Sequence, residues 1–528
     1  MQDRQRLAGR GLDAPILTIT TAQEARSRFS WESLWQLFDG DRERMNLAHE
    51  CLDRHRQRGQ AVSVQFADGH AEHYSFAELS DSSSRFANWL EQRGVGPGER
   101  VAVMLEPGKA FYTALFGAVK RGAIAVPLFT LFGPEGLALR IEDCRPSLIV
   151  TLDQEGLVRE RFPGLPVVRA DGAFWDELAM MSADYAPMTA ANDLAIFQYT
   201  SGTTRELPDA VKHTHRSAVT VMIAALYGVG LKPGDRYFCP SSPAWGHGLW
   251  HGTISPLVLG IHIGAYSGKF EAQRIFEALQ NFQIDNFAAA PTVFRMLRNA
   301  GIADRYRIAL KKISFTGEPM DDATFDWVEK TFGVAPASMY GSTEVGVLIV
   351  NFPGYPDHKV RRGALGQAAP GQRVDIVDRD GQILPAGQTG EIALARKDGW
   401  FFVKDRGRRD DDGYFYHEGR SDDVIISAGW TMSAVEIENA LLRHPDILEA
   451  AVIGVPDAVR GQVPKAFLVR RESGDSTVAD IQQFLKTQLS QHEYPRHIEY
   501  VTELPKTPAG KINRKILRDR EAAARAGS

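Results

Sequence analysis

Four hydroxyl side chains surround one glycine in a run of five small residues that follows an apolar stretch of strand length, residues 194–199. A phosphate-binding loop needs inward-pointing backbone N–H groups, a permissive glycine and hydroxyl donors. This run is not a Walker A loop, because neither GxxxxGKS nor GxxxxGKT occurs in the chain. Taken alone, it indicates either a phosphate site of another class or an ordinary turn between a strand and a helix. Its members are Thr200, Ser201, Gly202, Thr203 and Thr204.

Five more short motifs follow this loop in a fixed order. They are FTGEP at 315–319, YGSTE at 340–344, a segment around Asp405, GRSDD at 419–423 and PKTPAGK at 505–511. Each motif is weak by itself, because short patterns often match by chance. Together, the ordered set resembles the adenylate-forming superfamily, in its branch of acyl-CoA synthetases and aryl-CoA ligases. The resemblance extends from about Phe76 to Arg518.

The resemblance implies a two-step activation of a carboxylic acid. A free carboxylate is a poor electrophile, so the family uses it to attack the α-phosphate of ATP, which releases pyrophosphate and leaves an acyl-adenylate. A thiol then displaces AMP. Because the first step brings a carboxylate against a polyanion, the site must neutralise negative charge. The implied cofactors are ATP, Mg²⁺ and coenzyme A, which is the expected acceptor because only residues 512–528 follow the last motif. An external carrier protein is the alternative acceptor.

The resemblance gives three residues catalytic roles. Glu344 matches the carboxylate that faces Mg²⁺, a hard ion that prefers oxygen ligands. Thr343 matches the residue that hydrogen-bonds the α-phosphate. Lys511 is similar to the lysine that bridges the substrate carboxylate and the α-phosphate, a point charge that a mobile domain delivers on closure. A solvated surface lysine is the alternative, and it suits Lys506 and Lys515 better.

The same resemblance supplies the contacts to adenosine and coenzyme A. Tyr340 matches the aromatic ring that stacks on adenine. Asp405 matches the carboxylate that binds both ribose hydroxyls, although Lys404 precedes it where glycine is usual. Arg420 would make a second ribose contact, and Gly429 matches a glycine that lets the pantetheine arm pass close to the backbone. The alternative for each is a turn residue or a surface salt bridge. The adenine slot would be lined by Gly317, Glu318 and Pro319.

Two segments depart from the family pattern in charge. Arg205 and Glu206 replace the usual glycine of the hydroxyl-rich loop and lengthen it by one residue, and Asp209 stands where lysine is usual. Thr431 occupies a position where the family often has arginine. The loss of two cations beside the triphosphate would weaken ATP binding or slow the departure of pyrophosphate. Arg205 and Lys212 are the candidate replacements, but neither has the same offset.

The surviving motifs still favour a working enzyme. The hydroxyls of the loop, Glu344 and Lys511 are all present, which argues against the alternative of a non-catalytic nucleotide- or acyl-binding homologue. A dinucleotide oxidoreductase is disfavoured, because no strand opens into GxGxxG. A luciferase-like oxygenase would also require the adenylation step.

Bulky and small residues together outline the acyl pocket. The stretch SSPAWGHGLW at 241–250 falls where the family builds the walls of this pocket. The mixture favours a medium-sized acyl or aromatic acid over a long chain, with aliphatic and aromatic acids both open. His247 would pair with a polar substituent or a second carboxylate. The alternative is a packed histidine in a glycine-flanked turn. The candidate pocket residues are Trp245, His247, Trp250, Ala289 and Gly341.

Strand and helix patterns alternate around these motifs and place them on loops. Such alternation predicts a mainly parallel sheet covered by helices. Apolar runs predict strands at 101–105, 124–128, 146–151, 194–199, 261–266 and 286–290. Helical apolar spacing predicts helices at 109–122, 217–226, 271–282 and 321–332.

The pattern then changes to a β-rich one. Alternation of period two over 374–384, around an Asp-Gly turn, predicts a hairpin, and 390–395 predicts another antiparallel strand. These strands complete a large N-terminal adenylation domain, residues 1–421. Beyond it, a compact α+β pattern predicts a small mobile lid domain, residues 422–528. The family resemblance makes Asp422 the hinge.

The composition of the chain limits the class of protein and the partners that can be expected. The 528 residues exceed what one hydrophobic core holds, and 44% apolar with 24% charged residues fits a soluble globular protein. A net charge of −5 gives no reason to expect nucleic acid or a membrane as partner, and no apolar run has the length of a bilayer span. Cys51, Cys144 and Cys239 lie far apart, outside any CxxC pair, which favours a reducing, cytoplasmic location. A small-molecule acid and coenzyme A are the expected partners, and a homodimer stays open.

Overall fold

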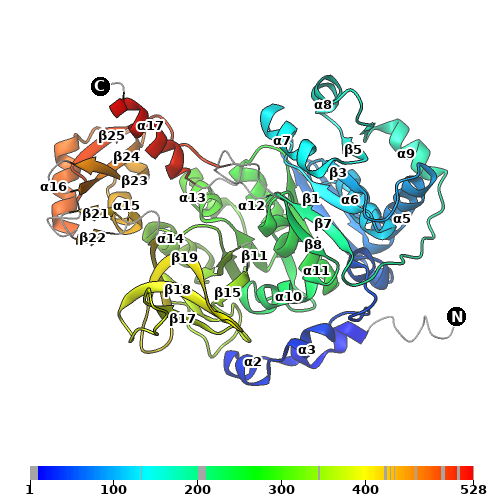
Figure 1. Ribbon diagram of the computed structural model, residues 1–528, viewed down its shortest axis with the longest axis horizontal. Coiled ribbons are helices and arrows are strands. Elements are labelled where there is room, and N and C mark those ends of the chain that lie inside the picture. Colours follow the sequence, from blue (N-terminus) through cyan, green and yellow to red (C-terminus); the bar gives the residue numbers. More distant parts are fainter. Residues whose placement is uncertain are drawn as a thin grey trace.

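Four β-sheets organise the part of the chain that a computed structural model describes (Figure 1). A six-stranded and a seven-stranded sheet hold most of the parallel strands, a second seven-stranded sheet is antiparallel, and a five-stranded sheet belongs to the C-terminal region. This arrangement confirms the predicted fold class. The described part comprises residues 10–132, 134–199, 210–342, 345–420, 425–427, 430–432, 434–457, 461–488, 494–507 and 512–526.

The six-stranded sheet has the order β6-β5-β3-β4-β7-β8, and β8 alone runs antiparallel to its neighbour within the described residues. Helices cover it, so its central strands are buried, as in most parallel sheets. The predicted strands between residues 101 and 199 are confirmed. The strands are β3 (Arg100–Met104), β4 (Ile124–Pro127), β5 (Leu148–Thr151), β6 (Val167–Arg169), β7 (Leu194–Gln198) and β8 (Val211–Thr214). The helices around them are α5 (Phe76–Gln92), α6 (Lys109–Arg121), α7 (Pro134–Cys144), α8 (Glu155–Arg161) and α9 (Gly172–Ala179).

The first seven-stranded sheet has the order β13-β12-β11-β9-β10-β1-β2, and its strands are parallel except for the β1–β2 pair. Because parallel strands end at the same edge, the segments that follow β9, β11, β12 and β13 become neighbours. The strands are β1 (Gln60–Phe66), β2 (Ala71–Ser75), β9 (Arg236–Phe238), β10 (His262–Ser267), β11 (Asn286–Ala289), β12 (Lys312–Phe315) and β13 (Ala337–Ser338). The connecting helices are α12 (Ala272–Asn281), α13 (Pro291–Ala300) and α14 (Asp322–Phe332).

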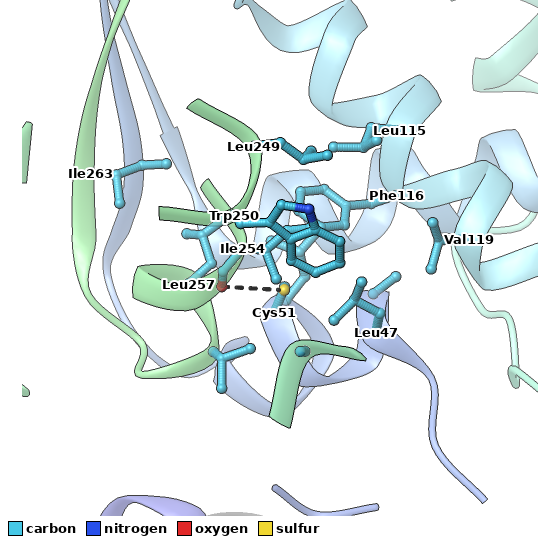
Figure 2. Close-up of a cluster of buried hydrophobic side chains, with 14 of the residues drawn as sticks. Leu47, Cys51, Leu115, Phe116, Val119, Leu249, Trp250, Ile254, Leu257 and Ile263 are labelled. Atoms are coloured by element: carbon cyan, nitrogen blue, oxygen red, sulfur yellow. Dashed lines mark hydrogen bonds between the residues drawn. The ribbon is translucent and has the colours of Figure 1, made fainter. Parts of the chain in front are cut away.

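A large apolar cluster fills the space between these two sheets. Figure 2 shows Trp250 at its centre, with Leu47, Phe116 and Ile254 around the indole ring. The thiol of Cys51 is buried there and donates to the carbonyl of Ile254 at 3.7 Å. Burial raises the pKa of this thiol well above its usual value, so Cys51 serves as a small apolar residue. The elements that meet here include α4 (Leu47–Cys51), α10 (Ser217–Ile223), the π-helical η4 (Ala224–Gly228) and η5 (His247–Ile254), and α11 (Ser255–Val258).

The antiparallel sheet has the order β14-β15-β16-β20-β19-β18-β17. Its hairpin differs from the one predicted over 374–384: β17 pairs along its length with β18, whereas the 382–384 side contributes one isolated bridge, Val377 to Ile383. Pro385 ends that side because it has no N–H to continue a ladder. The strands are β14 (Tyr340–Ser342), β15 (Gly346–Val350), β16 (Ala364–Ala368), β17 (Val374–Val377), β18 (Thr389–Arg396), β19 (Gly399–Arg409) and β20 (Phe415–Arg420).

The C-terminal region has its own sheet and its own apolar clusters. It contacts the large domain through an ion pair between Arg443 and Asp322, 2.7 Å apart. The proposed boundary at Asp422 lies outside the described residues and stays a prediction. The elements are β21 (Ile425–Ser427), β22 (Trp430–Met432), α15 (Ala434–Leu442), β23 (Ile447–Asp457), β24 (Gly461–Arg470), α16 (Val478–Gln488), β25 (His497–Tyr500) and α17 (Arg514–Ala526).

An N-terminal segment fastens the antiparallel sheet to the rest of the large domain. Its helix α2 (Ala22–Arg28) is capped from outside, because Asp357 accepts hydrogen bonds from the backbone N–H groups of Ala22 (2.6 Å) and Gln23 (2.9 Å). An anion at a helix N-terminus is favourable, since the first N–H groups have no partner within the helix. Partial burial raises the pKa of Asp357, but the two backbone hydrogen bonds lower it by a larger amount. The net pKa is therefore below its usual value.

We expect Asp357→Ala to lower the free energy of unfolding by about 1 kcal/mol near pH 7, the usual contribution of a helix cap. Because the folded pKa of Asp357 is depressed, this contribution is complete above the unfolded pKa of about 3.9 and is lost as the pH falls through the folded pKa. Urea unfolding at pH 7, and again below pH 3, measures both effects. Asp357→Asn is the matched control, because it keeps one acceptor oxygen and should lose less. Equal losses for the two variants would contradict the capping role.

Candidate active site

Strand pairing brings the FTGEP and YGSTE motifs together. Phe315, the last residue of β12, pairs with Ser338 in β13, and the backbone N–H of Met339 donates to the Phe315 carbonyl at 2.9 Å. Tyr340 therefore emerges beside the loop that contains Gly317. Sequence reasoning predicted that these two segments share one slot; the register of β12 and β13 makes them neighbours, and the shared slot stays a prediction.

Three hydrogen bonds to one carboxylate oxygen hold the Glu318 side chain in place. Oε1 accepts from the backbone N–H of Thr292 (2.9 Å), the Thr292 hydroxyl (2.5 Å) and Nη2 of Arg295 (2.7 Å). The carboxylate thus caps α13, which begins at Pro291. Gly317 has a φ of +102°, a conformation that favours glycine. It is the backbone of the 317–319 loop, rather than the Glu318 side chain, that is free to line an adenine slot.

Tyr340 and Asp405 meet although they are 65 residues apart in sequence. The Tyr340 hydroxyl donates to Oδ2 of Asp405 at 2.5 Å, and Nε2 of His417 lies 3.7 Å from Oδ1 of the same carboxylate. Across β19 and β20, Asp405 pairs in register with Arg420. The structure thus gathers the three residues expected around adenosine, and adds His417, which the sequence analysis missed. The GRSDD motif begins two residues after His417, but no residue pattern around His417 marked it.

A β-bulge in β19 aims Asp405 at this position. Glu391 of β18 pairs with Arg406 and Ala393 with Phe402, so three residues of β19 face a single residue of β18. Lys404 lies in this bulge with a φ of +64°, a left-handed conformation that is unfavourable for a residue with a side chain. The family has glycine here, and the lysine adopts the backbone that glycine would adopt. Bulges of this kind redirect a side chain beside an active site.

Gly341 has a backbone reason to be glycine. A Cβ at this position would lie 2.1 Å from the carbonyl oxygen of Gly346 and 2.7 Å from Cα of Val347. No side chain fits, because β14 and β15 pair there in a tight hairpin. The backbone of β15 therefore requires glycine at this position, whatever the residue contacts in a bound substrate.

The candidate acyl-pocket residues lie mainly on and around η5. Trp250 is 5% exposed, and its indole N–H donates to Oε1 of Gln198 at 2.9 Å. His247 is also buried, with Nδ1 3.0 Å from the Ser241 hydroxyl. The half-buried ring of Trp245 meets the His247 ring edge-on at 5.4 Å. Of these three predicted wall residues, Trp245 and His247 therefore contact each other, and Trp250 packs into the core cluster.

Ala289 lies apart from this surface. It belongs to the cluster of Phe287 and Phe294 on the helix-covered face of β11, whereas Ala288 belongs to the cluster of Trp250. Successive residues of a strand point to opposite faces. The small residue on the Trp250 side of β11 is therefore Ala288, and choosing between three consecutive alanines required the strand's orientation.

Two further histidines accompany Trp250 and His247, and the sequence analysis did not select them. The ring of His213, on β8, lies 4.7 Å from the Trp250 ring, and the ring of His251 lies 6.0 Å from that of His247. Burial lowers the pKa of both side chains to about 4, so both rings are neutral at pH 7. The spacing of His247 and His251, one helical turn apart, was the signal available in the sequence.

The remaining predicted contacts fall on residues that the structure does not describe, so their positions stay predictions. Lys212, one candidate for a replacement cation, is described: its ammonium lies over the Phe197 ring, 5.5 Å from the centroid. For Arg420 the backbone is described and the side chain is not. The predicted site residues outside the described part are Thr200, Ser201, Gly202, Thr203, Thr204, Thr343, Glu344, Asp422, Gly429 and Lys511.

Comparisons with known proteins agree with this geometry. The family model of the AMP-binding enzyme matches residues 52–399, and that of the AMP-binding enzyme C-terminal domain matches residues 436–511. Acetyl-coenzyme A synthetase of Bacillus subtilis (strain 168) is 30% identical over 96% of each chain. 4-Hydroxybutyrate–CoA ligase 1 of Metallosphaera sedula is 30% identical over 89% of each chain. The crystal structure of the anthranilate CoA ligase AuaEII with anthranoyl-AMP superposes with a TM-score of 0.82, at 27% identity, covering 92% of this chain and 99% of that one.

The chain therefore belongs to the AMP-binding enzyme family, the adenylate-forming superfamily. Within it, the protein is an AMP-forming acid–CoA ligase, which uses ATP to convert a carboxylic acid into an acyl-adenylate and then into a coenzyme A thioester. None of the described helices is long and apolar enough to cross a membrane.

We expect Lys404→Gly to raise the free energy of unfolding by about 0.5–1 kcal/mol. The substitution removes a left-handed strain of about 1–2 kcal/mol, and the greater freedom of glycine in the unfolded chain offsets part of the gain. Thermal unfolding measures the difference. Lys397→Gly is the matched control, because Lys397 is an exposed lysine outside the positive-φ residues, and it should lose stability. A loss of stability in Lys404→Gly would show that contacts of the lysine side chain outweigh the strain of its left-handed backbone.

Proposed function

We propose that this ligase activates a medium-sized acyl or aromatic acid and transfers it to coenzyme A. The observation that carries the size class is Trp250. Its indole N–H is held by Gln198, and apolar side chains from α4, α6 and η5 pack around the ring (Figure 2). A wall fixed in this way cannot withdraw to admit a long acyl chain without breaking a buried hydrogen bond, which costs about 1–3 kcal/mol.

The relatives support a compact acid. The names of the three similar proteins specify acetyl, 4-hydroxybutyrate and anthranilate groups, and a benzoate CoA ligase from Burkholderia xenovorans LB400 is 25% identical with a TM-score of 0.77. These acids range from two carbons to a substituted ring. Acids of this size are consistent with a pocket walled by the bulky residues of η5. The choice between aliphatic and aromatic acids needs a measurement.

For the adenosine half of ATP, we assign roles to the described residues. The Asp405 carboxylate would accept hydrogen bonds from both ribose hydroxyls. These would replace the hydrogen bond that it accepts from the Tyr340 hydroxyl. The Tyr340 ring would stack on adenine, and the 317–319 backbone would line the opposite side. Arg420, in register with Asp405, would add a ribose contact. Holding ATP on four sides lets its α-phosphate meet the acid in one orientation, which is a large part of the rate enhancement in a two-substrate reaction.

For the phosphates and the acceptor, the assignments rest on the family motifs. Thr343 and the loop 200–204 would donate hydrogen bonds to phosphate oxygens, and Glu344 would bind Mg²⁺, which neutralises charge as pyrophosphate leaves. Lys511 would bridge the acid and the α-phosphate. The lid, residues 422–528, would turn about Asp422 and then present Gly429 to the pantetheine arm of coenzyme A. We place the enzyme in the cytoplasm, where its free cysteines stay reduced.

The experiment that tests the proposal is pyrophosphate release with ATP and Mg²⁺ across a panel of acids, with and without coenzyme A. The panel runs from acetate, butyrate, octanoate and palmitate to benzoate, hydroxybenzoates, aminobenzoates and phthalate. We expect release with a compact acid, accelerated by coenzyme A, and none with palmitate. Efficient use of palmitate, or silence across the panel from folded protein, would overturn the proposed substrate class.

Lys511→Ala tests the catalytic assignment. Removing a charge that stabilises the transition state of adenylation should lower the rate of acyl-adenylate formation about 100- to 1000-fold. Lys515→Ala, on a neighbouring surface lysine of α17, is the control and should keep the wild-type rate. Product analysis by mass measures the acyl-adenylate directly. Equal rates of acyl-adenylate formation for the two variants would show that Lys511 has no catalytic role.

A further inference from the structure

Two buried ring nitrogens beside the proposed acyl pocket have no hydrogen-bond partner within the described residues. They are Nε2 of His213 and Nδ1 of His251. Each of these two atoms is shielded from solvent, whereas the residue to which it belongs is only half-buried. An unsatisfied buried polar group costs about 1–3 kcal/mol. His213 adjoins Trp250 and His251 adjoins His247, so a polar ligand bound against these two predicted wall residues would relieve both groups.

The surroundings keep these rings in a fixed position. His213 faces the Trp250 side of β8, because its neighbour Lys212 points to the opposite face, over Phe197. His251 follows Trp250 in η5 and lies one turn beyond His247. A π-helix is rare, and it is frequently found at functional sites. Figure 2 shows the apolar side of η5, where Trp250 and Ile254 enter the core.

The chemistry of the surface is polar but uncharged. His213 and His251 are neutral at pH 7, because burial lowers the pKa of each to about 4. The side chains that contact this surface in the described structure are uncharged as well: Gln198 on Trp250, and Ser241 on His247. Among the described residues, a second carboxylate in the substrate would meet no cation here and would be desolvated without compensation. A neutral imidazole instead offers one donor and one acceptor.

We propose that the acid carries an uncharged hydrogen-bonding group on its acyl portion, a hydroxyl or an amino group, and that His213 and His251 bind it. This inference rests on the proposed function, because it places the acyl portion of the acid against Trp250. A hydroxyl or amino group both donates and accepts, so it complements two neutral imidazoles. A site built to bond such a group discriminates strongly against the analogue that lacks it, since the site's own buried groups then stay unpaired.

Matched acid pairs test the inference. We would measure kcat/KM for pyrophosphate release with benzoate against hydroxybenzoates and aminobenzoates, with butyrate against 4-hydroxybutyrate, and with phthalate as the charged analogue. The expected result is a preference of at least about 10-fold for a hydroxy or amino acid over its parent, with phthalate poor. Preference for a parent acid or for phthalate would overturn the inference while leaving the acid–CoA ligase intact. Silence with all of these acids would overturn the proposed substrate class, and the inference with it.

Substitutions then assign the preference to the two histidines. His213→Phe and His251→Phe keep a ring and remove its nitrogens, so each should reduce the substituted-to-parent ratio of kcat/KM about 10- to 100-fold. His213→Gln retains a polar atom near the position of Nε2, and His251→Asn retains one near Nδ1; both should restore part of the ratio. If a phenylalanine variant fails to fold, these two variants still test the role of the histidines. His70→Phe, on the exposed edge of the molecule, is the control. An unchanged ratio in the His213 and His251 variants would refute their role.

Discussion

The parallel pairing of β11, β12 and β13 is the constraint on which the active site depends. Backbone hydrogen bonding fixes the register of these strands, and the register places the segments that follow them along one edge. From that edge come the cap of α13 by Glu318, the 317–319 loop and the segment that begins with Tyr340. Little of this geometry is decided by the site residues themselves. A shift of one residue between β12 and β13 would separate the two motifs and turn their side chains to the other face.

The antiparallel sheet supplies the other half of the adenosine site, and its contribution is more local. A bulge turns Asp405 towards Tyr340, and the positive φ of Lys404 is part of that turn. The strain persists because the ladders on both sides of the bulge fix the backbone. Strain of this kind is often found at functional sites. Here it accompanies one of the positions at which the sequence departs from its family.

The two ends of the proposed substrate meet very different environments. The nucleotide side is rich in charge and hydrogen bonds, with Asp405, His417 and the Glu318–Arg295 pair. The acyl side is a surface of tryptophan and neutral histidine, backed by the core that surrounds Trp250 (Figure 2). Burial explains the second environment, because desolvation disfavours the imidazolium form. Such a division suits an enzyme that must hold a polyanion at one end and select a small neutral group at the other.

The sequence by itself determined the family, the reaction class and the alternation of strands and helices, because these depend on local patterns: the order of short motifs and the spacing of apolar residues. It also indicated Tyr340, Asp405 and Trp250. Only the tertiary structure decided that Glu318 caps a helix, that Ala288 rather than Ala289 shares the Trp250 cluster, and that His213 adjoins Trp250. Those facts depend on register, strand orientation and burial. They are set by contacts between residues far apart in the chain, and no local pattern records them.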